Sequence, residues 1–188
     1  VALGVALAVK PWALFLLPML MRPSDTWRRR VLLPCLSLAI GVVTWAPFLF
    51  ASSDTVGGVK PSVWVAPDSV YRLYTGASST MPTVLRLAQL GACLVAVAWV
   101  TLRGHVSCAL LLGVSVRLLL DGGTWSYYTA GFVVGALLWD VLESDYPLPW
   151  ATIAASALLP KPTWIEPAEV RSLMRLVACL AAVALVLW

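Results

Sequence analysis

Arg117 and Asp121 are the charged pair whose spacing most directly suggests chemistry in this sequence. They stand four residues apart, at the end of the apolar run 106–120. Residues with this spacing share one face of a helix, where opposite charges pair. A guanidinium group also matches phosphate oxygens better than an ammonium group does. Two interpretations therefore stay open: an ion pair that closes the end of a helix, or a phosphate site in which Arg117 provides the cation.

Three aromatic side chains follow this pair in the stretch DGGTWSYYTAG. Trp125, Tyr127 and Tyr128 combine an apolar ring face with a polar edge, which suits such rings to stack against sugars. Rings of this kind also anchor helices at a membrane interface. Both interpretations stay open, and the first makes Asp121 and the three aromatic residues candidates for binding a sugar or an acceptor.

Two further cations stand alone within apolar runs. Lys10 lies near the middle of the run 1–21 and precedes a proline. A charge at the centre of a membrane span costs at least ~2.5–3.5 kcal/mol, so it needs a partner or a watery cavity. The alternative is a shifted register that brings Lys10 to an interface. Arg86 is the one charge in the run 82–102. Both join Arg117 as candidates for binding a phosphate group.

The composition identifies an integral membrane protein. Hydrophobic residues make up 61% of the 188 residues and charged residues 12%, whereas soluble domains carry roughly 25% charged residues. The net charge of +4 comes from scattered residues, apart from the cluster in 22–30, so we expect no nucleic-acid partner. No phosphate-binding glycine loop, metal-ligand cluster or GxSxG motif is present, and we expect no metal and no cofactor.

Apolar runs long enough to cross a bilayer predict an all-α fold, a polytopic transmembrane helix bundle of about seven spans within a single domain, 1–188. A span needs about 20 residues. The weakest prediction is 148–160, which covers only about 20 Å of a ~30 Å core and is expected to tilt or re-enter. The predicted spans are 1–21, 31–51, 82–102, 106–120, 124–142, 148–160 and 173–188.

Loop charges predict the orientation in the cell membrane. Arg22, Arg28, Arg29, Arg30 and Arg103 lie in one set of loops, against Lys60, Arg72, Lys161 and Arg171 in the other. The dense cluster in 22–30 favours a cytoplasmic location, because the bias is strongest in short loops near helix ends. The loops 52–81, 121–128 and 161–172 are then extracytoplasmic.

The run GVALAVKPWALFLLPMLMRPSDTWRRR, with its Lys-Pro inside an apolar span and a basic loop after it, resembles a helix of actinobacterial GT-C type membrane glycosyltransferases. The stretch from Arg117 through TWSYYTAG is similar to a late loop of the polyprenol-phosphate-mannose-dependent mannosyltransferases in that group. The resemblance implies transfer of a mannose-like sugar from a polyprenyl-phosphate donor to an envelope lipid or glycan at the outer face. It also implies that membrane lipid and a polyprenyl-phosphate sugar are the partners.

Enzymes of that type carry their catalytic carboxylate in the first extracytoplasmic loop, and no loop of this sequence matches it. Because the chain opens on Val1 within an apolar run, we expect a fragment truncated at the N-terminus. The chain also ends within an apolar run, so a truncation at the C-terminus stays open. The catalytic base is then in the missing part and the fragment alone is inactive. The alternative functions are a transporter or lipid flippase with Lys10 and Asp140 in a central pathway, and a membrane scaffold.

Overall fold

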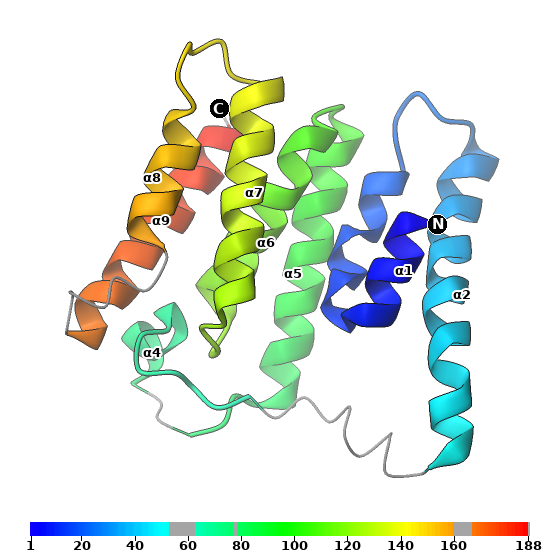
Figure 1. Ribbon diagram of the computed structural model, residues 1–188, viewed down its shortest axis with the longest axis horizontal. Coiled ribbons are helices and arrows are strands. Elements are labelled where there is room, and N and C mark those ends of the chain that lie inside the picture. The colour runs from blue at the N-terminus through cyan, green and yellow to red at the C-terminus, as the bar shows by residue number, and fades with distance from the viewer. Residues whose placement is uncertain (53–62, 77–78, 160–166, 188) are drawn as a thin grey trace.

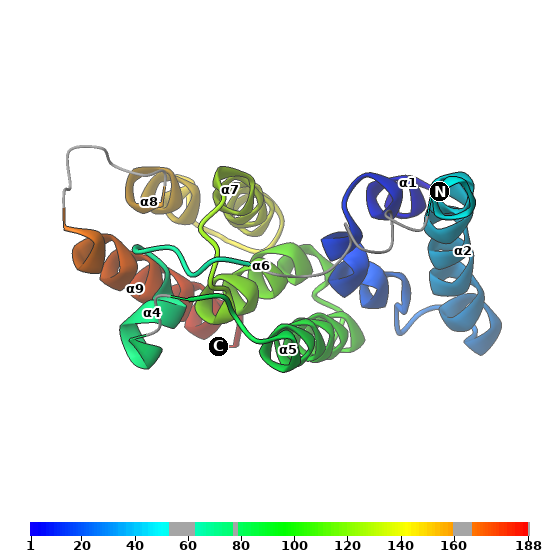
Figure 2. The same cartoon turned by 90° about the horizontal axis from the view of Figure 1, so that it is seen from below.

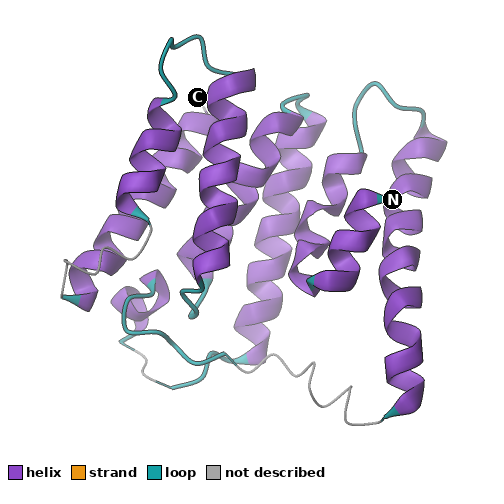
Figure 3. Ribbon diagram, in the orientation of Figure 1, coloured by secondary structure: helices purple, strands orange, loops and turns teal. Residues whose placement is uncertain are grey.

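The computed structural model describes residues 1–52, 63–76, 79–159 and 167–187. All regular elements in these ranges are helices, and the β-type pairing is a single bridge between Trp64 and Thr80. Figures 1 and 3 show the helices arranged side by side as a bundle. The all-α prediction is therefore confirmed.

Three helices are long and apolar enough to cross a membrane. They are α2 (Trp27–Ala51), α5 (Thr83–Leu102) and α9 (Ala168–Leu187). The shorter apolar helices are η1 (Pro11–Leu20), η2 (Val106–Cys108) continuing into α6 (Ala109–Leu120), and α7 (Ser126–Leu142). The remaining helices are α1 (Ala2–Val9), α4 (Val70–Thr75) and α8 (Trp150–Leu158). By length and composition the described residues thus contain three candidate spans, fewer than the seven expected.

The segment 1–21 is not one span, which corrects the prediction made from its hydropathy. Lys10 has extended backbone angles (φ −141°, ψ 100°) and separates α1 from η1. The following proline explains this, because its ring disfavours the helical conformation at the preceding residue. Helix α1 runs parallel to α2, and the chain then returns along η1 (Figure 1). Lys10 therefore lies at a turn between two short helices.

Helix α6 is at the centre of the bundle, between α5, α7 and α9 (Figure 2). The α6–α7 packing depends on Gly135, since a Cβ atom there would come within 2.7 Å of the Leu111 backbone. Gly131, one turn earlier on the same face, would meet only Val114, at 3.5 Å. The GxxxG pattern of α7 thus allows two helices to approach closely, as small residues do in membrane bundles.

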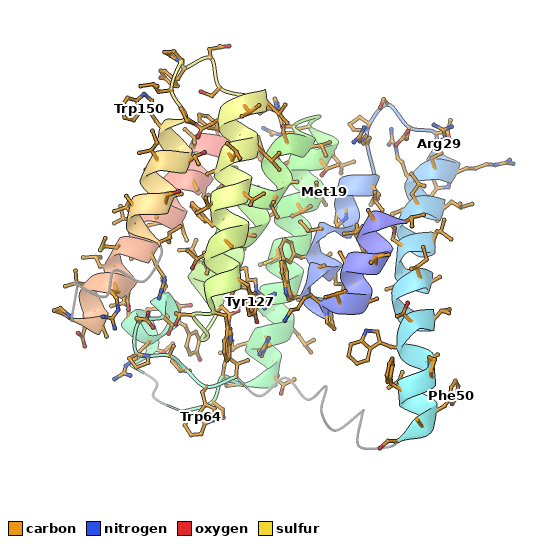
Figure 4. The ribbon with its side chains drawn as sticks, in the orientation of Figure 1. Met19, Arg29, Phe50, Trp64, Tyr127 and Trp150 are labelled. Carbon is orange, nitrogen blue, oxygen red and sulfur yellow. The ribbon has the colours of Figure 1, made fainter. Side chains whose placement is uncertain are left out.

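Two ends of the bundle can be defined. At the first, which we call the Asp68 end, Ala66 N–H donates to the carbonyl of Gly122, and Asp68 meets Arg175 of α9. At the opposite Arg103 end, residues 22–24 lie beside 104–107. Figure 4 shows Tyr127 and Trp64 toward the first end, and Arg29 and Trp150 toward the second. The described parts of the three loops predicted to be extracytoplasmic lie together at the Asp68 end.

Candidate functional site

The Arg117 side chain is buried in the last turn of α6 and is held on several sides. Its Nε lies 3.3 Å from Oδ2 of Asp121, and its Nη2 donates to the hydroxyl of Tyr128 at 2.6 Å. The guanidinium carbon also lies 4.3 Å from the centre of the Tyr128 ring and 5.5 Å from that of Trp12. The i,i+4 ion pair that the sequence suggested is therefore present, and a tyrosine hydroxyl and two ring faces accompany it.

The loop after α6 is fixed by Asp121 itself. Its Oδ1 accepts a hydrogen bond of 2.9 Å from the backbone N–H of Gly123, which closes a tight turn. A side chain at Gly123 would meet the Trp125 indole nitrogen at 2.9 Å. Gly123 thus leaves room for Trp125 to fold back over the loop, and Asp121 connects Arg117 with the aromatic residues that follow.

Four aromatic side chains gather beside this ion pair, and we call them the ring cluster: Trp12, Trp125, Tyr127 and Tyr128. The Tyr127 ring is nearly parallel to those of Trp12 and Trp125, with centroid distances of 6.4 and 6.3 Å, and Tyr128 meets it edge-on at 4.4 Å. Trp125 is 55% exposed and Tyr127 is 37% exposed. The cluster therefore has a buried part against Arg117 and an accessible part formed by Trp125 and Tyr127.

Lys10 reaches this cluster from the turn between α1 and η1. Its Nζ lies 4.7 Å from the centre of the Tyr127 ring, and the residue is exposed. No described carboxylate lies within ion-pair distance of Lys10. A cation over a tyrosine face is attracted to the ring quadrupole yet keeps its ammonium hydrogens available. Lys10 is therefore the more accessible of the two cations in the cluster.

A second ionic group ties α4 and the 121–125 loop to α9. The Asp68 carboxylate lies 2.9 Å from Nη1 of Arg175 and 3.7 Å from Nε of Arg171. It also accepts a hydrogen bond of 2.8 Å from the Thr124 hydroxyl, and the Asp68 carbonyl accepts one from Arg175. Both Asp68 and Arg175 are buried. This group fixes the loop that carries Trp125.

Of the predicted site residues, six come together and one does not. The structure gathers Lys10, Arg117, Asp121, Trp125, Tyr127 and Tyr128. Arg86 is partly buried on α5 and forms no ion pair with a described residue.

Sequence reasoning missed three contributors. The Trp12 ring contacts both the Arg117 guanidinium and the Tyr127 ring, and Gln89 donates to the Arg117 carbonyl at 3.0 Å. Arg175 holds Asp68 across 107 residues of chain. Trp12 follows the Lys-Pro pair and could have been suspected from that position, whereas the other two gave no local signal.

The chemistry available here is cationic and aromatic. Lys10 can bind an anion, and the exposed rings can stack against a ring-shaped ligand. Arg117, expected to bind phosphate, is buried and already paired with Asp121. Both carboxylates of the described site, Asp68 and Asp121, are paired with arginines, so neither is a good candidate for a general base. Within the described ranges, no three His, Cys, Asp or Glu side chains are grouped to hold a metal ion.

No family model, no curated protein and no solved structure matches this chain.

Proposed function

We propose that this chain is the membrane-embedded part of a glycosyltransferase that moves a mannose-like sugar from a polyprenyl-phosphate donor to an envelope lipid or glycan. One observation carries the proposal: an exposed lysine, a buried arginine and a set of stacked rings meet at one end of a helix bundle. A lipid-linked sugar phosphate carries a negative charge, a sugar ring and a hydrocarbon chain close together in one molecule.

Each part of the cluster has a role in this proposal. Lys10 binds the donor phosphate and stabilises the charge that develops as the sugar departs. Arg117 is paired with Asp121 and acts mainly by holding Tyr128 and the ring cluster in place. The accessible rings of Trp125 and Tyr127 support the sugar. The general base that takes the acceptor proton comes from residues outside this cluster.

In the proposed topology, the Asp68 end faces the outside of the cell. Residues 22–24 and 104–107, which lie side by side at the opposite end, then face the cytoplasm. Arg28 and Arg103 are near these two loops in the chain, which agrees with the positive-inside rule. The expected seven spans become fewer complete crossings, because α8 has nine residues and covers about 14 Å. Helix α8 and the α1–η1 pair enter the membrane without crossing it.

The placement of Asp140 favours this proposal over a transporter or flippase. Its carboxylate accepts hydrogen bonds from the backbone N–H groups of Ala151 and Thr152, at 3.2 and 2.7 Å, and from the Thr152 hydroxyl at 2.6 Å. Asp140 therefore caps the first turn of α8. An acidic residue with these bonds is poorly suited to a central transport pathway.

The experiment compares one lysine variant with one arginine variant, each in membranes that contain the full-length protein. Lys10→Gln removes the cation beside Tyr127, while Arg103→Gln removes a cation stacked on Trp99, 4.2 Å from the ring centre, at the opposite end. A charge-assisted hydrogen bond contributes about 1.5–3 kcal/mol. We therefore expect Lys10→Gln to raise the KM for polyprenyl-phosphate mannose about 10- to 100-fold, and Arg103→Gln to leave it unchanged.

The results can contradict the proposal in two ways. If the wild-type protein transfers no sugar from a polyprenyl-phosphate donor, the proposed reaction is wrong. If transfer occurs and both variants behave alike, the reaction stands but Lys10 does not bind the donor. Lys10→Arg serves as the conservative control, because it keeps the positive charge and should retain most of the affinity.

A further inference from the structure

An apolar groove runs between α2 and the α1–η1 pair, outside the cluster described above. It has a volume of about 300 Å³ and is lined by Leu7, Pro11, Leu14, Leu38, Val42 and Trp45, among others. The one polar atom of the Trp45 side chain, its indole N–H, donates to the carbonyl of Ala8 at 2.9 Å. The walls therefore offer no free hydrogen-bonding group from Trp45, and they suit a hydrocarbon ligand.

The groove is open on the α2 side. Helix α2 packs chiefly against α1 and η1, and Leu38 and Val42 on the groove wall are 43% and 56% exposed. Figure 2 shows α2 at the edge of the bundle, with α1 between it and the remaining helices. A flexible chain can enter this groove from the side without any helix moving.

Lys10 is adjacent in the chain to the wall of this groove. Pro11, the next residue, forms part of the wall, and the Lys10 ammonium has no described carboxylate partner. An apolar groove with a cation adjacent to its wall is complementary to an amphiphile that carries an anion on a long chain. An uncharged lipid would use the walls and leave the ammonium without a counter-charge.

We propose that the hydrocarbon chain of a lipid phosphate lies in the groove between α1–η1 and α2, with its phosphate bound by Lys10. This inference rests on the proposed function, which it deepens by giving the donor chain a binding site. It separates the two halves of the donor: the chain lies against α2 and the sugar lies on the ring cluster. Tyr127, which contacts the Lys10 ammonium, is at the boundary between them.

The test uses photo-crosslinking of the purified chain in detergent. The probe is farnesyl phosphate that carries a diazirine on its last isoprene unit, and the uncharged match is the corresponding farnesol. Crosslinked peptides are mapped by mass spectrometry, and half-saturating concentrations are measured for each variant. No sugar transfer is needed for this readout, so the groove can be tested even if the proposed reaction is wrong.

Two leucines of α2 provide a matched pair of variants. Leu38→Trp fills the groove, whereas Leu36→Trp changes a leucine of similar exposure, 46% against 43%, that does not line it. We expect crosslinks in α1, η1 and α2, at least a tenfold loss of labelling in Leu38→Trp, and no loss in Leu36→Trp. Lys10→Gln should raise the half-saturating concentration of farnesyl phosphate about tenfold or more and leave that of farnesol unchanged.

Four results would overturn the inference. Crosslinks confined to α5–α7 would place the chain elsewhere, even if sugar transfer is observed. Equal labelling of the wild type by farnesol and farnesyl phosphate would show that Lys10 does not bind the phosphate. Equal loss in Leu36→Trp and Leu38→Trp would point to a general effect on α2. Loss of α2 labelling in a dimeric fraction separated by size-exclusion chromatography would show that a second copy of the chain occupies the groove.

Discussion

The carboxylate of Asp121 lies 3.3 Å from the Nε of Arg117, one helical turn further along the chain, and both side chains are buried. The pair joins the end of α6 to the loop that carries the ring cluster, because Asp121 also accepts the N–H of Gly123. Breaking such a pair leaves one buried charge without its partner, which costs more than the pair itself contributes.

We predict that Arg117→Met destabilises the folded protein by about 3–5 kcal/mol, since the Asp121 carboxylate then remains buried and unpaired. The double variant Arg117→Met, Asp121→Asn should recover much of this loss, because Asn can still accept the Gly123 N–H. The measurement is the free energy of unfolding in mixed micelles. A single variant as stable as the wild type would contradict the pairing, and a stable double variant allows sugar transfer to be assayed without the arginine.

The helical class of the fold and the Arg117–Asp121 pair were both predictable from the sequence. Composition alone indicates a membrane protein, and the four-residue spacing brings the two charged residues onto one helix face. The place where the chain turns within an apolar segment was not predictable in the same way, because hydropathy reports only how apolar the segment is. The segment 1–21 shows this, since its apolar character is continuous across the break at Lys10.

The sequence does contain a signal for the helix break at Lys10, although hydropathy does not show it. A residue before proline avoids the helical conformation, and Lys10 precedes Pro11. The break moves Lys10 from the centre of an expected span to a turn beside Tyr127. The sequence named Lys10 as a candidate because of its charge, but its contact with the ring cluster follows only from the way η1 returns against α5 and α6.

The contacts at long sequence separation gave no local signal. Asp68 and Arg175 form an ion pair across the chain, and neither neighbourhood carries a motif that predicts the other. Asp140 is 7% exposed and caps α8, a contact that its own sequence neighbourhood does not predict. Pro149 precedes that helix and offers no capping side chain, which explains why a carboxylate from α7 takes the role.

Gly135→Ala tests the close packing of α6 and α7. The added Cβ would come within 2.7 Å of the Leu111 backbone, and overpacking of this kind costs typically ~1–3 kcal/mol. Gly91→Ala on α5 is the matched control, because a Cβ at Gly91 meets no atom within 4 Å and alanine favours a helix over glycine by roughly 0.5–1 kcal/mol. We expect a lower melting temperature for the first variant only, and a similar loss in both would contradict the close approach.

Asp140→Ala should destabilise α8 through its first turn. Removing a capping side chain costs about 0.5–2 kcal/mol, and here the backbone N–H groups of Ala151 and Thr152 lose their acceptor. Asp140→Asn keeps an acceptor oxygen and should retain most of the stability. Hydrogen exchange at these two amides is the direct measurement, and unchanged protection in Asp140→Ala would show that α8 does not depend on this cap.

The last prediction concerns pH and the Arg103 end. Hydrogen bonds from the Ser107 hydroxyl and from His105 hold the pKa of the Glu143 carboxyl below its usual range, and the His105 charge acts in the same direction when that ring is protonated. A carboxyl whose pKa is lower in the folded protein than in the unfolded chain stabilises the fold above the unfolded value. That contribution is lost as the pH falls below 4.5 and through the lower pKa of the folded state.

We therefore expect unfolding midpoints of the wild type to fall between pH 5 and pH 3 more steeply than those of Glu143→Gln, which has no charge to lose there. The difference should be small, within about 1 kcal/mol, because solvent screens an ion pair near the surface. Asp145→Asn is the control, since Asp145 is exposed and forms no ion pair with a described residue. Parallel pH profiles for the wild type and Glu143→Gln would mean that Glu143 does not hold η2 against the end of α7.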